Sequence, residues 1–110
     1  MKITFSKFKN SEYLKSIEVS GHAGYARRGQ DILCASISAI TQSGALGILK
    51  VLGIKAHYET DEDKGYLKLE LPQTLSEQEL GETQIVFETM LVSLRDLHTG
   101  YSKYFQLEVK

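Results

Sequence analysis

Apolar and polar residues alternate in five short stretches of the chain, which predicts five β-strands. In the fourth stretch, Leu67, Leu69 and Leu71 share one side. Lys68 and Glu70 lie on the opposite side, so one face of this strand belongs to a core and the other faces water. The five stretches are residues 1–8, 14–20, 56–60, 66–71 and 104–109.

A long uncharged run, residues 32–49, predicts the first helix. Asp31 directly precedes it and is a good N-cap, while Gly53 can close the helix, so we expect it from Ile32 to about Val51. Serine, threonine, glutamine and glycine within the run make it a poor membrane span. We therefore expect a helix packed on a protein core, more deeply buried than the second helix.

The second helix is predicted by a capping box, in which Ser76 and Glu79 bond each other's backbone N–H groups. It should end near Gly100, and its apolar positions recur at helical spacing. The order ββαββαβ with short hairpin links predicts a single α+β domain over residues 1–110, with a mostly antiparallel sheet covered by two helices. The expected buried stripe of the second helix is Leu80, Phe87, Leu91 and Leu94.

Composition narrows the classes of protein. A chain of 110 residues with 42% hydrophobic residues suits one globular domain. The net charge of −1 argues against the strongly basic kind of nucleic-acid binder. The only cysteine has no partner for a disulfide within the chain, and the first residues are too polar for a signal-peptide core. We expect a protein of a reducing compartment without direct nucleic-acid or membrane partners.

That cysteine, Cys34, is the third residue of the first predicted helix. Backbone N–H groups of a first turn have no partner within the helix, and the helix dipole favours negative charge there. The position therefore predicts a stabilised thiolate with a pKa below the ordinary value. The alternative is that Cys34 is a small core residue.

His22 closes the second predicted strand, twelve residues before Cys34. A strand end and the start of the following helix are commonly close in space, so the imidazole can form a Cys–His pair with the thiol. The alternative is a loop histidine bonded to backbone. Asp31 has two candidate roles, as helix cap or as the group that orients His22.

The connecting segment, residues 21–30, is rich in glycine and predicts a mobile loop. Tyr25 offers an aromatic surface for a substrate. The loop glycines are Gly21, Gly24 and Gly29, and Arg27 and Arg28 are interpreted as solvated loop charges. A metal site of His22, Cys34, His57 and His98 is not expected, because the spacings match no ligand pattern.

The segment GHAGYARRGQDILCASIS, residues 21–38, resembles the signature of the bacterial ribosomal-processing cysteine protease (Prp) family. That family has a Gly-His-Ala-Gly-Tyr segment followed by Asp-Ile-x-Cys-Ala-x-x-Ser at this spacing. The resemblance implies Cys34 as nucleophile and His22 as base. It also implies supporting roles for Asp31 and Ser38, as helix cap or in orienting the histidine.

The resemblance further implies a substrate and a setting. Members of the family remove a short N-terminal extension from a bacterial large-subunit ribosomal protein, cutting after an aromatic pair. A cytoplasmic homodimer without cofactor or metal is implied. The expected chemistry is acyl transfer, with backbone N–H groups near the helix start receiving the oxyanion. Tyr25 and the second subunit are candidates for the pocket that holds the aromatic side chains.

Two other classes of function remain open. One is a non-catalytic adaptor that binds a ribosomal protein, in which Cys34 is merely packed. The other is a thiol redox sensor or peroxidase that uses Cys34 alone. Only the protease hypothesis gives both His22 and the cysteine a task.

Overall fold

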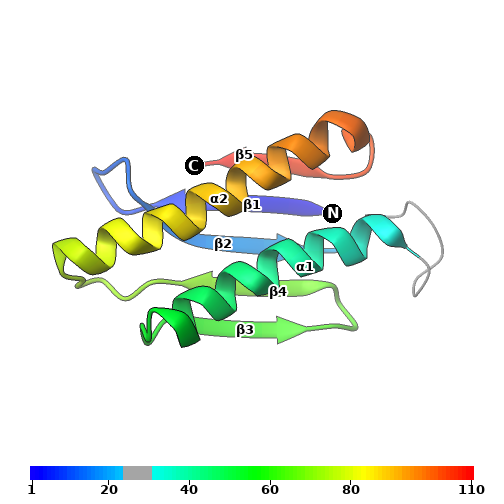
Figure 1. The fold of residues 1–110 in the computed structure, drawn as a ribbon. Helices are drawn as coiled ribbons and strands as arrows, with labels where there is room; N and C mark the ends of the chain where they lie inside the picture. Colours follow the sequence, from blue (N-terminus) through cyan, green and yellow to red (C-terminus); the bar gives the residue numbers. More distant parts are fainter. Residues whose placement is uncertain (24–30) are drawn as a thin grey trace.

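The computed structural model describes residues 1–23 and 31–110. A five-stranded sheet has both helices on one of its faces (Figure 1). The predicted α+β domain with a mostly antiparallel sheet is therefore confirmed. The strands are β1 (Lys2–Lys7), β2 (Leu14–Ser20), β3 (His57–Asp61), β4 (Tyr66–Glu70) and β5 (Gln106–Val109). The helical elements are α1 (Ile32–Leu46), the π-helical turn η1 (Gly47–Val51) and α2 (Glu77–Tyr101).

The strand order across the sheet is β3-β4-β2-β1-β5. Neighbours pair antiparallel except β5, which runs parallel to β1 and places Leu107 beside Ile3. A parallel neighbour needs a crossover, and α2 supplies it by carrying the chain over the face of the sheet (Figure 1). The hairpin of β3 and β4 consequently forms one edge of the sheet.

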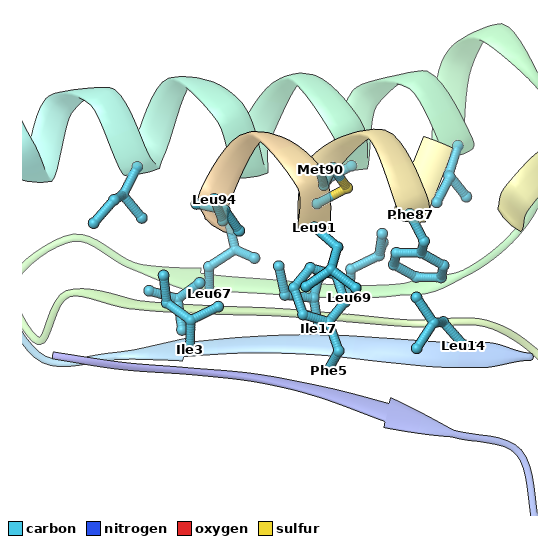
Figure 2. Close-up of a cluster of buried hydrophobic side chains, with 14 of the residues drawn as sticks. Ile3, Phe5, Leu14, Ile17, Leu67, Leu69, Phe87, Met90, Leu91 and Leu94 are labelled. Carbon is cyan, nitrogen blue, oxygen red and sulfur yellow. The ribbon is translucent and has the colours of Figure 1, made fainter. Parts of the chain in front are cut away.

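The core lies between the sheet and the two helices (Figure 2). The predicted inward residues of β4, Leu67 and Leu69, are 5% and 0% exposed. Phe5 of β1 meets Phe87 of α2 edge to face, with ring centroids 6.3 Å apart. These contacts hold α2 on the sheet. Leu33 and Ile37 of α1 belong to the same core and hold the start of α1 beside it.

The first helix runs to Val51, as predicted, but its last turn has a different geometry. After Leu46 it continues as a π-helical turn, in which Leu52 N–H donates to Gly47 O at 2.9 Å. Gly53, with φ +67°, then ends it as expected. In a π turn the backbone N–H groups bond to the carbonyl five residues earlier. The spacing of apolar residues does not reveal this change of hydrogen bonding.

The 20-residue stretch of α1 and η1 is long and apolar enough to cross a membrane, with mean hydropathy 1.7. Its inner side, however, packs in the core through Leu33, Ile37 and Ile48. Six of these 20 residues are buried, against five of the 25 residues of α2, so the first helix is the more deeply buried of the two, as predicted. Ile32 is 73% exposed, because only one side of a helix lying on a sheet can meet the core.

The second helix begins as predicted. Ser76 accepts from Glu79 N–H, and the Glu79 carboxylate accepts from Ser76 N–H, which completes the capping box. Leu80 is only half-buried, whereas the rest of the predicted stripe is in the core. The buried residues of α2 are Thr83, Phe87, Met90, Leu91 and Leu94.

Candidate active site

A groove of about 480 Å³ lies between the first half of α1 and the β3–β4 hairpin. The predicted site residues that line it are Gly21, His22, Asp31, Cys34 and Ser38. The opposite wall comes from the hairpin, residues 60–62 and 65–67. Gly24, Tyr25, Arg27, Arg28 and Gly29 lie outside the described residues. The sheet and α1 thus bring together residues that are up to 17 positions apart within the signature segment.

Cys34 is partly buried in the first turn of α1. Its sulfur accepts a hydrogen bond from Ala23 N–H at 3.1 Å. Asp31 is 8% exposed, and both of its carboxylate oxygens accept hydrogen bonds from Cys34. Oδ1 accepts from Cys34 N–H at 3.0 Å, which caps the helix, and Oδ2 accepts from the thiol at 3.4 Å. The helix cap and the reactive thiol are therefore one hydrogen-bonded unit.

The predicted lowering of the Cys34 pKa is wrong for this arrangement. Burial raises the pKa of the thiol above its ordinary value, and the Asp31 hydrogen bond and charge raise it further. The Ala23 N–H lowers it but does not offset the rise. The helix dipole argument left out burial, which is the largest cause of the rise, and the negative charge that the capping carboxylate brings to the same helix end. Loss of the thiol proton is therefore disfavoured in this arrangement.

We expect Asp31→Asn to make Cys34 more reactive at lower pH. An asparagine side chain still caps the helix, but it removes the negative charge that disfavours the thiolate. The pKa of Cys34 should therefore fall. The pH at which alkylation by iodoacetamide reaches half its maximal rate measures this pKa. Asp96→Asn, an exposed change on α2, is the matched control, and an unchanged or higher midpoint for Asp31→Asn would refute the assigned effect of Asp31.

The backbone N–H groups at the helix start are partly occupied. Cys34 N–H bonds the Asp31 carboxylate, and Ala35 N–H donates to Asp31 O at 3.1 Å. The expectation that N–H groups near the helix start receive the oxyanion stays a prediction, and these two donors already have acceptors. The donor already directed at the sulfur is Ala23 N–H, from the strand end and not from the helix.

The His22 ring is held from the β3–β4 turn. Its Nε2 lies 3.2 Å from Asp63 O, and a carbonyl oxygen only accepts, so Nε2 carries a proton in this bond. Within residues 1–23 and 31–110 there is no hydrogen bond between the ring and the Cys34 sulfur. The Asp31 carboxylate bonds Cys34, and the His22 ring lies within hydrogen-bond distance of the Asp63 carbonyl.

The other histidines lie apart from the groove. His57 is 3.6 Å from the Glu59 carboxylate, and the His98 ring packs edge-on against Phe105. In the part of the chain that the structure describes, no three His, Cys, Asp or Glu side chains are arranged to hold a metal ion. The thiol of Cys34, the imidazole of His22 and the carboxylate of Asp31 line the groove.

Two features of the site were not predicted from the sequence. Ala23 lies within the signature segment, but its role comes from its N–H, which every residue type except proline has. The turn at residues 62–65 is 40 or more positions after His22 and carries no motif of its own. Only the pairing of β2 with β4 brings it beside the histidine.

Comparison with known proteins gives a consistent result. The family model for cysteine protease Prp matches residues 1–106. The ribosomal processing cysteine protease Prp of Bacillus subtilis is 31% identical over 86 residues, 78% of this chain and 77% of that protein. The protein of the same name from Staphylococcus aureus is 27% identical over 92 residues, 84% and 83% of the two chains.

Solved structures share the fold. A crystal structure of the S. aureus ribosomal processing protease Prp with a covalently linked product peptide has a TM-score of 0.85. It is 23% identical and covers 99% of this chain and 98% of that one. A structure of the S. aureus protease with a substrate peptide has a TM-score of 0.80. With a family match along nearly the whole length and the thiol in a groove, this chain belongs to the ribosomal-processing cysteine protease (Prp) family.

Proposed function

We propose that this cysteine protease removes the short N-terminal extension of a bacterial large-subunit ribosomal protein, cutting after an aromatic pair. Cys34 is the nucleophile and His22 is the general base and acid. The observation that carries the proposal is that Cys34 and His22 line one groove that is open to a peptide. The family match and the names of the curated relatives support ribosomal processing as the task.

The raised pKa of Cys34 favours a mechanism with a base. Burial and Asp31 disfavour a free thiolate, so we propose that the thiol loses its proton during attack. The ring of His22 is the base in the same groove, and its Nε2 is occupied by Asp63 O. Its Nδ1 is therefore the nitrogen that takes the proton.

The proposed reaction has two steps. As the Cys34 sulfur bonds the scissile carbonyl carbon, the thiol proton moves to His22 Nδ1, and an oxyanion forms. When the C–N bond breaks, His22 gives that proton to the leaving amine, which leaves a thioester on Cys34. Water then attacks the thioester while His22 takes its proton, and Cys34 recovers the proton as the acid product departs. Ala23 N–H, 3.1 Å from the sulfur, stabilises negative charge there.

The groove supports the proposed substrate class. Its floor includes the apolar side chains Val19, Ile37 and Leu67, and Tyr66 adds an aromatic ring. Such a surface suits aromatic side chains of an extended peptide. Two structures of the S. aureus protease hold a substrate or product peptide, and we transfer that kind of ligand to this groove.

A synthetic peptide tests the substrate. It spans the N-terminal extension, the aromatic pair and the residues that follow, and mass spectrometry locates the broken bond. The expected result is one cut directly after the aromatic pair, and none in a control peptide with two alanines in its place. Binding without cleavage would favour the adaptor. Cleavage elsewhere, or in both peptides equally, would overturn the proposed specificity.

The redox alternative is weaker. Peroxide oxidises the thiolate form, and a raised pKa leaves less thiolate at neutral pH. The chain also has no second cysteine to resolve a sulfenic acid. Both observations favour the protease hypothesis over the redox sensor.

The homodimer and the cytoplasmic location that the resemblance implies stay predictions. Exposed apolar side chains on the outer side of α2 support an interface, since Ile85 and Val92 are 69% and 61% exposed. They lie along a shallow depression together with Glu88 and Thr89. Sedimentation equilibrium would measure the oligomeric state.

A further inference from the structure

The turn between β3 and β4 packs directly against the segment that carries His22. The contact is between backbone and backbone. Gly65, in the left-handed conformation with φ +64°, lies against the backbone of Gly21. A Cβ atom at Gly65 would overlap the Gly21 carbonyl oxygen. It would also lie 3.0 Å from Cε1 of the His22 ring. Only glycine fits at this contact.

The same turn holds the far side of the ring. The Asp63 carbonyl, two residues before Gly65, accepts from His22 Nε2 at 3.2 Å. The turn itself is closed by Gly65 N–H donating to Glu62 O and by Lys64 N–H donating to Asp61 Oδ1, both at 3.2 Å. The Asp63 carbonyl is therefore presented by a hydrogen-bonded turn at the end of a paired hairpin.

We infer that this turn, residues 62–65, is the positioning element for His22, with the Asp63 carbonyl fixing the ring and Gly65 allowing the approach. The inference rests on the proposed function of His22 as the base. A carbonyl acceptor at Nε2 keeps the neutral ring in the tautomer whose Nδ1 is unprotonated. The orienting role that a carboxylate has in many triads is thus performed here by a backbone group.

The first test is the tautomer of His22 in the wild-type protein. Histidine is labelled with ¹⁵N in the ring, and long-range ¹H–¹⁵N spectra are recorded at a pH where His22 is neutral, with His22→Gln identifying its signals. The expected result is a protonated Nε2 and an unprotonated Nδ1. A protonated Nδ1 would overturn the inference. This measurement needs no substrate, so it stands even if the proposed peptide is not cleaved.

The second test compares two glycines. Gly65→Ala should lower kcat about 100-fold, with a smaller change in KM, because displacement of the base by the new Cβ misaligns proton transfer. Gly53→Ala is the matched control, since its φ of +67° imposes the same backbone strain but nothing lies within 4 Å of its Cβ position. Equal activity of the two variants would overturn the inference. If Gly65→Ala does not fold, the tautomer of the wild-type protein decides.

Discussion

Cys34→Ala will abolish cleavage of the extension peptide, with kcat/KM at least ~10⁴-fold below wild type, because the sequence contains no other thiol. Cys34→Ser is expected to be nearly as inactive, since a hydroxyl is a much weaker nucleophile without a strongly activating base. The rate of product formation, followed by mass spectrometry, measures both. The thermal unfolding midpoint provides the control, because the two variants change one partly buried atom and should stay folded.

The contrary outcome is informative. If Cys34→Ala cleaves the peptide at a rate near wild type, the thiol is not the nucleophile. The adaptor hypothesis predicts a different pattern, in which wild type and Cys34→Ala bind the peptide with the same affinity and neither protein cleaves it. Measuring affinity and cleavage on the same samples separates the two hypotheses.

His22→Ala is expected to lower kcat roughly 10³-fold, the size typical of a lost general base. The raised pKa of Cys34 makes this loss large, because the thiol has to lose its proton during attack. The rate that remains in His22→Ala should rise with pH, as hydroxide and free thiolate replace the base. The measurement is a pH series of kcat for wild type and variant.

His57→Ala is the matched control for the histidine. His57 lies on β3, is paired with Glu59 and does not line the groove. It should keep wild-type kcat at every pH. A loss of activity in His57→Ala equal to that in His22→Ala would show that removal of any histidine perturbs the protein, and the role of His22 would fall.

Several features of the fold were predictable because they depend on neighbouring residues. The N-cap at Asp31 and the capping box at Ser76 follow from local side-chain bonding, and both are present. The inward faces of the strands follow from alternation, as for Leu67 and Leu69. The parallel pairing of β5 with β1 was not predictable, because it depends on where α2 delivers the chain.

The site, too, combines features that the sequence predicts with features that depend on the folded chain. The signature segment supplied Cys34, His22 and Asp31, and the structure brings all three to one groove. The direction of the Cys34 pKa shift could not be predicted, since burial and the second carboxylate oxygen of Asp31 outweigh the helix dipole. The turn at Asp63 was missed because a backbone carbonyl leaves no mark in the sequence.

The most direct test of the central claim is to look for the acyl-enzyme. Wild-type protein and the extension peptide are mixed, quenched in acid within the first turnover, and the intact protein mass is measured. The account predicts a species heavier by the N-terminal product less one water, located on Cys34 by fragmentation and missing from Cys34→Ala. Cleavage by the wild-type protein without this species at any time, together with cleavage by Cys34→Ala, would contradict it.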